Sequence, residues 1–473
     1  MAMILLSSNF LLATPEFFCK NDNGELNMCS EKKFCKKHYN TGDYSEDQID
    51  WRYNSWVQQY GLICDKNSYR GSYKQVLQFV SGFVCLIGTI ASDSMGRLTV
   101  LKNYSLAILS IALLGYMSPS LDWRIFCMGI FVGQEGLVCT IFVFLIQESC
   151  STESSLRSRS VAVYFTVFAL GGLLLAILTM MITNPDTLYL CCILSAFATC
   201  LPLYFMCVEA PKQLYKRGKI SELFECLNKI SIINGNPMEI RSLQKIANLN
   251  QLDLESSKIK IETKTTFKEK MQLFIKSFSD IIYGGHLFNF FGLIVQCIAM
   301  FVVYNGITYN SGDIGFSSIQ LDVALLGIVE AITYLLVTFL MADMPRRKGS
   351  IMCMLVIILS AFLTVIVHNV LPNFYGKSSL ETLLTVGAIK AALSIIFVIM
   401  YTYGAELFPS NIRGTTNGIA FNFGRGISII SAYLITLSVE TFETNAIVGC
   451  AAVCLLSLPF LGFMPETVGR EIE

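Results

Sequence analysis

Four charged residues lie inside long apolar stretches of the sequence. Lys390 and Arg425 are basic, and Glu135 and Glu330 are acidic. A charge at the centre of a lipid bilayer costs about 2.5–3.5 kcal/mol on insertion scales, so such a residue needs a partner or a task. The guanidinium of Arg425 can hold a carboxylate through two parallel hydrogen bonds, and the Lys390 ammonium can act as a mobile point charge. The two basic residues therefore predict either a binding site for an anionic ligand or pairing with carboxylates of the protein.

The positions of the two basic residues place them deep in their segments. Lys390 lies sixteen residues before Glu406, which is roughly 24 Å at a helical rise of about 1.5 Å per residue. Arg425 lies twelve residues after Arg413, which is roughly 18 Å at the same rise. Both distances reach the middle of a hydrocarbon core about 30 Å thick.

The two acidic residues each allow two interpretations. Glu135 lies in the middle of its segment, where burial favours the neutral form of a carboxyl group and suits it to binding a coupling proton. The alternative is a static pair with a basic residue across the bundle. Glu330 is expected to make a structural polar contact between helices, with a role in ion coupling as the alternative.

The composition is that of a membrane protein. Of the 473 residues, 53% are hydrophobic and 15% are charged, whereas soluble domains average about 25% charged. The mean hydropathy is +0.55. Lys and Arg balance Asp and Glu at 35 each, which leaves no basic excess for binding nucleic acid.

Twelve segments are candidates for membrane-spanning helices, each of which needs about 20 apolar residues. The first, from Ala2 to Phe18, is short, and we interpret it as a helix that is natively short or truncated. The other eleven are 73–92, 100–119, 124–147, 158–182, 187–208, 286–309, 319–342, 350–371, 380–408, 414–438 and 443–464. The predicted fold class is an all-α membrane protein with two six-helix bundles.

Two polar insertions divide the chain, and a long middle loop is expected between two six-helix repeats. The middle insertion contains a stretch, Ile220–Ile233, with amphipathic character. The predicted units are a partial first helix (1–18), an extracellular loop (19–72), the rest of the first bundle (73–208), a cytoplasmic loop (209–285), the second bundle (286–464) and a cytoplasmic tail (465–473).

The short loops differ in charge, and this difference predicts the orientation. One set contains Arg97, Arg157, Arg346 and Arg413, whereas the other is mostly acidic. Cytoplasmic loops carry an excess of Lys and Arg, so the basic set is predicted to be cytoplasmic. The 19–72 loop then lies outside the cell or in a lumen. Its four cysteines, which allow three pairings if they form two disulfides, are Cys19, Cys29, Cys35 and Cys64.

A loop motif occurs at equivalent places in the two halves. Ser92-Asp93-Ser94-Met95-Gly96-Arg97 follows the second segment, and Asp343-Met344-Pro345-Arg346-Arg347 follows the eighth. Gly96 permits a tight turn, and the flanking charges can bridge helix ends. The first loop resembles the D-x-x-G-R motif of the major facilitator superfamily, in which such bridges close the inner gate and break when the halves rock.

Further motifs narrow the resemblance to the organic cation and anion transporter family, which includes the carnitine transporters. They cover the chain from about Cys19 to Thr467. These motifs are Gln59-Tyr60-Gly61-Leu62-Ile63-Cys64-Asp65, Val208-Glu209-Ala210-Pro211-Lys212, Tyr401-Thr402-Tyr403-Gly404-Ala405-Glu406-Leu407-Phe408-Pro409 and Pro465-Glu466-Thr467.

The resemblance implies roles for individual residues. Anion-transporting members carry a Lys and an Arg at the positions of Lys390 and Arg425, so it implies an organic anion or zwitterion as substrate. Tyr304 matches a family aromatic, and Tyr401 and Phe421 are further candidates for the cavity wall; the alternative for each is ordinary helix packing. Residues expected to form the cytoplasmic gate are Asp93, Gly96, Arg97, Glu148, Arg157, Glu209, Asp343, Arg346, Glu406, Arg413 and Glu466.

The sequence departs from the family pattern at three positions. Leu98, Thr89 and Pro345 replace the usual Arg, Gly and Gly. Two alternatives stay open beside an anion or zwitterion transporter. One is an organic cation transporter, against which Lys390 and Arg425 count; the other is a non-transporting membrane subunit or receptor, which Leu98, Pro345 and the short first helix favour.

Other classes of function are disfavoured by the sequence. No Cys/His cluster has metal-site spacing, there is no nucleotide-binding GxxxxGK[ST] motif, and no catalytic constellation occurs. We therefore expect no cofactor, no metal, no enzymatic activity and no nucleic-acid partner. The expected partners are a small organic solute and the lipid bilayer, for a functional monomer in the plasma membrane.

Overall fold

The fold is known from a computed structural model of the chain. It describes residues 2–13, 15–20, 26–29, 31–36, 48–51, 54–64, 67–149, 154–205, 207–216, 219–235, 281–309, 319–340, 344–370, 380–408, 412–428 and 447–468.

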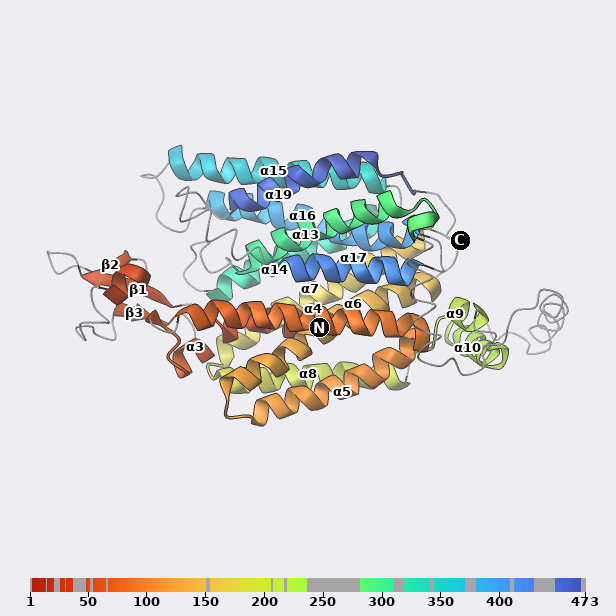
Figure 1. The fold of residues 1–473 in the computed structure, drawn as a ribbon, viewed down its shortest axis with the longest axis horizontal. Coiled ribbons are helices and arrows are strands. Elements are labelled where there is room, and N and C mark those ends of the chain that lie inside the picture. Colours follow the sequence, from red (N-terminus) through yellow and green to blue (C-terminus); the bar gives the residue numbers. More distant parts are fainter. Residues whose placement is uncertain are drawn as a thin grey trace.

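The described helices of the bundle fall into two sets of six, of which the first element, α1, is short (Figure 1). The first set contains α1 (Ala2–Leu11), α4 (Asn67–Met95), α5 (Arg97–Met117), α6 (Leu121–Ser149), α7 (Ser154–Met181) and α8 (Pro185–Phe205). The second set contains α13 (Leu287–Tyr309), α14 (Ile319–Leu340), α15 (Arg346–Val370), α16 (Leu380–Leu407), α17 (Arg413–Ile427) and α19 (Ile447–Phe463).

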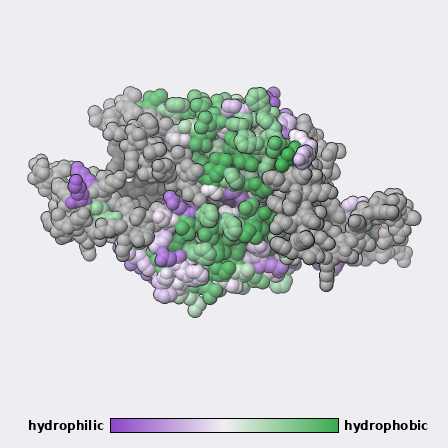
Figure 2. All heavy atoms as spheres, in the orientation of Figure 1, coloured by the Kyte–Doolittle hydropathy of each residue, from purple (hydrophilic) through white to green (hydrophobic). Residues whose placement is uncertain are grey.

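The outer surface of the helices is apolar, as expected for contact with lipid. Figure 2 shows a broad hydrophobic band across the middle of the molecule. Large apolar side chains such as Phe79, Phe339 and Leu359 are exposed on the helices. Within the described part of the chain, nine helices are long and apolar enough to cross a membrane, and Gly449–Phe463 is a shorter apolar helix. The chain is therefore an integral, multi-pass membrane protein.

Small elements lie at opposite ends of the helical bundle (Figure 1). At one end, β1 (Glu16–Lys20) pairs antiparallel with β2 (Leu26–Cys29) and with β3 (Ile49–Asp50), next to the short helices α2 (Glu31–Phe34) and α3 (Trp56–Gln59). We call this the sheet end. At the other end lie α9 (Pro211–Lys216) and α10 (Ile220–Ile233). We call this the basic end, because the Arg-bearing loops lie there.

Two disulfides hold the sheet end together. Cys19 is bonded to Cys29, and Cys35 is bonded to Cys64. Around them, Phe17, which is buried, packs with Phe34 at 5.0 Å between ring centroids. Of the pairings that the sequence left open, one therefore joins β1 to β2, and the other joins Cys35, directly after α2, to Cys64 in the segment before α4.

The structure corrects the predicted extent of the first segment. The apolar run was expected to be helical from Ala2 to Phe18, but α1 ends at Leu11 and β1 begins at Glu16. Pro15 stands between the two elements and cannot continue a helix with a full set of hydrogen bonds. Phe17 and Phe18, read as part of the span, belong to β1.

Other predicted boundaries also shift. Residues 67–72, assigned to the polar loop, form the first turns of α4. The predicted amphipathic stretch is helical and coincides with α10. Residues 429–446, which contain the end of one predicted span and the start of the next, lie outside the described residues.

The two sets of helices pack against each other mainly through two pairs of helices, α4 with α17 and α7 with α14. In the first pair Asn422 donates to the Thr89 hydroxyl at 3.3 Å, and a methyl added at Gly418 would lie only 3.0 Å from that hydroxyl. In the second pair Phe165 stacks on Tyr334, with ring centroids 5.4 Å apart. Thr89, where the resembling family has Gly, is therefore accommodated because a glycine faces it from the other half.

Candidate functional site

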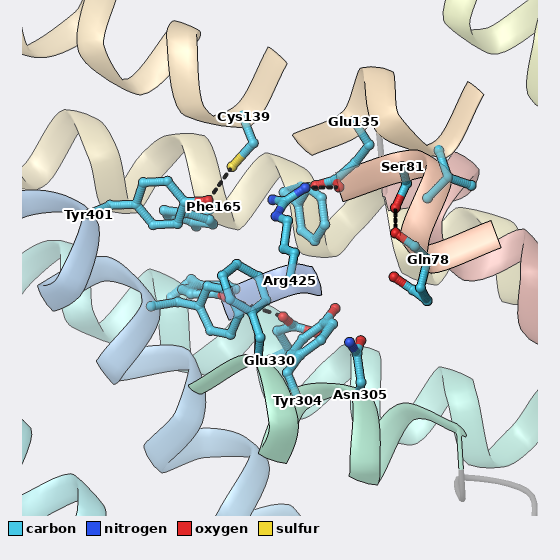
Figure 3. Close-up of a pocket in the computed structure, with 15 residues that line it drawn as sticks. Gln78, Ser81, Glu135, Cys139, Phe165, Tyr304, Asn305, Glu330, Tyr401 and Arg425 are labelled. Carbon is cyan, nitrogen blue, oxygen red and sulfur yellow. Dashed lines mark hydrogen bonds and ion pairs between the residues drawn. The ribbon is translucent and has the colours of Figure 1, made fainter. Parts of the chain in front are cut away.

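A cavity lies between the two halves (Figure 3). Its volume is about 40 Å³ when measured as the space open to the centre of a water molecule, and one water needs about 10–15 Å³ on that measure. The lining comes from both halves and includes Gln78, Ser81, Val132, Glu135, Cys139, Phe165, Phe168, Phe301, Tyr304, Asn305, Glu330, Tyr334, Phe397, Tyr401 and Arg425. An organic solute fits only after some of these side chains move.

Arg425 of α17 and Glu135 of α6 form an ion pair across this cavity. The Arg425 Nη1 donates to the Glu135 Oε2 at 3.2 Å, and Figure 3 shows the two side chains reaching toward each other. The side chain of Glu135 is 3% exposed and that of Arg425 is 13% exposed. The pair therefore joins the two halves at a largely dry position.

The surroundings of Arg425 are shaped to hold a guanidinium. Gly136 leaves its space open, because a methyl group added there would coincide with the guanidinium. On another side the Arg425 Cζ lies 5.1 Å from the centroid of the Phe301 ring, a cation–π contact. The Arg425 Nε is buried and has no hydrogen-bond partner among the described residues, so the guanidinium keeps donor capacity for a ligand.

Lys390 and Glu330 form a second ion pair, entirely within the second half. The Lys390 Nζ lies 3.1 Å from the Glu330 Oε2 and 4.0 Å from the centroid of the Tyr304 ring. Glu330 and Tyr304 line the cavity. Lys390 therefore contacts two residues of the cavity lining but is not itself among the described lining residues.

An aromatic wall completes the cavity. Tyr401 stacks on Phe421 with centroids 4.1 Å apart and planes at 11°, and the Cys139 thiol donates to the Tyr401 hydroxyl at 3.6 Å across the two halves. Phe165 and Phe397 contribute further faces. Flat aromatic surfaces of this kind suit a flat organic solute.

Arg346, the first residue of α15, forms a buried cluster at the basic end. Its guanidinium contacts Glu406 through Nε at 3.3 Å and Nη2 at 3.4 Å. The same Nη2 donates to the hydroxyl of Ser158 on α7 at 2.7 Å. Ser158 belongs to the other half, so this bond ties the two halves together at the basic end.

The first half carries a corresponding ion pair. Arg97, the first residue of α5, contacts Glu148 through Nη2 at 2.9 Å. Arg413 interacts electrostatically with Glu148 of the first half and with Glu406 of the second. Nearby, the Gln147 amide donates to the main-chain carbonyl of Tyr401 at 3.3 Å. The charged residues expected at the gate thus meet across the halves at the basic end.

Two glutamates cap equivalent helices in the two halves. Both oxygens of Glu209 accept from the Leu98 N–H, at 3.2 and 3.1 Å. Glu466 accepts from the N–H groups of Arg346 and Arg347, at 2.7 and 3.2 Å. A carboxylate satisfies the free N–H groups of a helix start and suits its positive dipole end. The repeat of this contact relates α5 to α15.

The remaining residues expected at the gate have different outcomes. Gly96, between α4 and α5, has a φ of 110°, a conformation that favours glycine. Arg157 is buried at the basic end of α7. The side chain of Asp93 and the whole of Asp343 lie outside the described residues, so their contacts stay a prediction.

A further polar cluster joins the sheet end to the first bundle, and sequence reasoning did not find it. Asp186 of α8 accepts from the Trp56 indole N–H at 3.0 Å and pairs with Arg124 of α6 at 2.6 Å. Trp56 is fully buried and packs edge-on against Tyr189. Tryptophan in a polar loop, with an acidic and a basic residue at nearby helix ends, was the available signal.

Metal ligation has no support in the described part of the chain, where no group of three or more His, Cys, Asp or Glu residues is arranged to hold a metal ion.

Two bundles of six helices with a cavity between them, and paired charges at one end, are the architecture of a membrane facilitator. A sequence model of the Major Facilitator Superfamily matches residues 149–433, and the chain belongs to that superfamily. Its curated relatives include proteins named as organic cation/carnitine and organic anion transporters, the family that the sequence motifs predicted.

Three relatives illustrate the range of similarity. Organic cation/carnitine transporter 5 of Arabidopsis thaliana is 26% identical over 76% of this chain and 65% of its own length. Solute carrier family 22 member 15 of Xenopus tropicalis is 24% identical over 97% of this chain and 82% of its own. Organic anion transporter 3 of Rattus norvegicus is 23% identical over 89% and 75%. The chain thus spans less than two thirds of the length of this plant transporter.

Solved structures share the fold. The proton:xylose symporter XylE bound to 6-bromo-6-deoxy-D-glucose superposes with a TM-score of 0.67 at 15% identity, covering 100% of this chain and 95% of its own. The human organic anion transporter MFSD10 has a TM-score of 0.60 at 13% identity, covering 97% and 96%. The predicted fold class is confirmed.

Proposed function

We propose that this protein is a secondary transporter that moves a small organic anion or zwitterion across a membrane by alternating access. The observation that carries the proposal is the position of Arg425 in a cavity between the two halves, with a buried Nε that has no partner among the described residues. The curated relatives are named as transporters of organic cations, carnitine and organic anions, which supports the general class.

The chemistry of the cavity favours a ligand with a negatively charged group. Of the described residues that line it, Arg425 is the only cation, and a guanidinium binds carboxylate or sulfonate oxygens through two parallel hydrogen bonds. The Tyr401 and Tyr304 rings, which line the cavity, would hold the organic part of the solute, and Phe421 would support the Tyr401 ring from behind. Lys390 would strengthen the positive potential when Glu330 turns away from it.

The gate in this proposal is the cluster at the basic end. Arg346, Glu406 and Ser158 close the cavity from that side, and breaking the Ser158 contact is one step in opening it. The disulfide-bonded sheet lies at the opposite end (Figure 1). Because disulfides persist in oxidising compartments, we place the sheet end outside the cell, the basic end in the cytoplasm and the protein in the plasma membrane, as a monomer.

A cation transporter is the second candidate, supported by the two carboxylates, Glu135 and Glu330, that line the cavity. Both are already held by basic residues, Arg425 and Lys390. A cation would have to compete with a guanidinium or an ammonium fixed in the protein, so this candidate ranks below the first.

Uptake by purified protein in liposomes distinguishes the candidates. Three probes share a phenyl ring and differ in charge: benzenesulfonate, phenylalanine and benzyltrimethylammonium. We expect the anion or the zwitterion to enter, and Arg425→Asp to abolish that uptake. Entry of the cation alone, unaffected by Arg425→Asp, would show that Arg425 is structural and would contradict the proposal. No uptake of any probe by correctly inserted protein would favour a non-transporting role.

A further inference from the structure

Glu135 and Arg425 come from opposite halves, and each compensates the charge of the other. Their ion pair has a length of 3.2 Å, and Glu135 is almost completely buried. A ligand anion that accepts the hydrogen bond which Arg425 Nη1 now donates to Glu135 must displace the Glu135 carboxylate. The displaced carboxylate then stays in a confined cavity without its cation.

The other groups that face Glu135 cannot replace Arg425. Electrostatic contacts reach it from Cys85 of α4, Cys139 of α6, Tyr164 of α7 and Tyr401 of α16. Thiols and phenols of this kind are neutral near pH 7 when unperturbed, so they supply no positive charge. From α17 the facing group is Arg425 itself.

The second ion pair does not supply the missing charge either. Lys390 is 3.1 Å from Glu330 and lies over the Tyr304 ring. Both members of this pair belong to the second half, so they can move together without separation. If Lys390 turned from Glu330 to Glu135, Glu330 would become the carboxylate without a partner. The two basic and two acidic residues balance each other, so a bound anion leaves one carboxylate without a cation.

A proton is the remaining way to neutralise the displaced carboxylate. An isolated ionised carboxylate is strongly disfavoured in surroundings shielded from water, and binding a proton removes the charge. Figure 3 shows Gln78 and Ser81 of α4 on the Glu135 side of the cavity. Their polar side chains line the same cavity and can hold the water through which a proton arrives.

We propose that Glu135 is a proton-binding site that couples the entry of an organic anion to the entry of one proton. This inference rests on the proposed transport function and names its coupling ion. In the empty protein, Arg425 is cationic and Glu135 is anionic. In the loaded protein the anion pairs with Arg425, and Glu135 carries a proton on its carboxyl oxygen. On release the anion leaves, the proton passes to water, and the Arg425–Glu135 pair forms again.

The charge balance has two consequences. The loaded and empty cavities have the same net charge, so symport of one monovalent anion with one proton is electroneutral. A zwitterion whose ammonium reaches Glu135 while its anionic group binds Arg425 satisfies both residues and needs no proton. Proton coupling is therefore expected for anions and not for such zwitterions.

Benzenesulfonate uptake into proteoliposomes tests this inference, because the sulfonate stays ionised at every pH used and any proton must be carried by the protein. A 1:1 symport accumulates the probe about tenfold for each pH unit of inward proton gradient. A membrane voltage set with potassium and valinomycin should have no effect. In Glu135→Gln we expect the pH gradient to lose its effect, while exchange of internal for external benzenesulfonate persists.

A matched variant and a second measurement keep the test decisive. Asp186→Asn also removes one carboxylate from an ion pair, but this pair with Arg124 lies at the sheet end, away from the cavity, so the variant should retain accumulation driven by the pH gradient. For the wild-type protein in weakly buffered detergent, a pH-indicator dye should report uptake of about one proton for each benzenesulfonate bound. This readout does not depend on the folding of any variant.

The outcomes separate the inference from the function on which it rests. Uptake that follows voltage instead of the pH gradient, or a Glu135→Gln protein that still accumulates the probe with the gradient, overturns proton coupling and leaves the transporter proposal intact. Absence of uptake of all three probes by the intact protein overturns both.

Discussion

The hydrogen bond between Arg346 and Ser158 is expected to hold the basic end closed, and Ser158→Ala tests this. The bond is 2.7 Å long, and both side chains are buried. A hydrogen bond to a charged group contributes about 1.5–3 kcal/mol. The lower figure applies here, because the same Nη2 also contacts Glu406. Losing about 1.5 kcal/mol shifts the equilibrium toward the open form by about tenfold.

Chemical labelling of Cys139 measures this shift. Its thiol lines the cavity and is buried in the closed form, so a membrane-impermeant thiol reagent reaches it from the basic end only when the gate opens. In inside-out vesicles, with labelling quantified by peptide mass spectrometry, Ser158→Ala should raise the rate about tenfold. Cys454 is buried in the second half and serves as an internal reference whose rate should not change.

Ser160→Ala is the matched control. Ser160 lies two residues further along α7, and its hydroxyl donates to the Leu156 carbonyl of its own helix. Its removal should leave Cys139 labelling at the wild-type rate. Equal rates in wild type and Ser158→Ala would refute the argument that this bond contributes to closure, and a rise in both serine variants would point to a general loosening of α7.

Three further substitutions test the account at other places. Gly136→Ala puts a methyl group where the Arg425 guanidinium lies, so we expect benzenesulfonate uptake to fall at least about tenfold; Gly426→Ala, whose methyl would meet no atom within 4 Å, should retain it. Cys35→Ser opens a disulfide that spans 29 residues and should lower the free energy of unfolding by about 3.6 kcal/mol on the chain-entropy account. The variant should therefore melt at a lower temperature than the wild type, and reductant should lower its melting temperature less than that of the wild type. Glu466→Ala leaves two N–H groups at the start of α15 without their acceptor and should cost about 1–2 kcal/mol; an unchanged melting temperature would contradict this cap.

The sequence predicted the helices and the repeat because those features are local. A span is recognised from some 20 apolar residues in a row, and the Gly96 turn and the Arg346 loop stand at equivalent places after the second and eighth segments. The four charges inside apolar segments were found for the same reason. Each is improbable at its position, whatever surrounds it.

The pairing of those charges could not be predicted, because it depends on how helices from the two halves are rotated and shifted. Arg425 pairs with Glu135, 290 residues away, and Lys390 with Glu330. Helix α6 is buried over most of its length, so no polar face shows which side of it Glu135 occupies. Ser158 and Trp56 were missed because a single serine or tryptophan carries no pattern.

The first segment was misjudged because hydropathy alone does not separate a helix from a strand in a short apolar run. Phe17 and Phe18 continue the apolar run of α1, but Pro15 precedes them and Cys19 is bonded to Cys29 in the neighbouring strand. The proline was the local signal that ended the helix. The disulfide, which fixes the strand, depends on a partner ten residues away.

Ligand protection of Cys139 is the most direct test of the claim that a solute binds beside Arg425 between the two halves. Purified protein is alkylated with and without benzenesulfonate, and the Cys139 peptide is quantified for wild type and Arg425→Gln. The account predicts that the anion slows labelling in wild type and not in Arg425→Gln, while benzyltrimethylammonium protects neither. Equal protection of both proteins by the anion would contradict a binding role for Arg425.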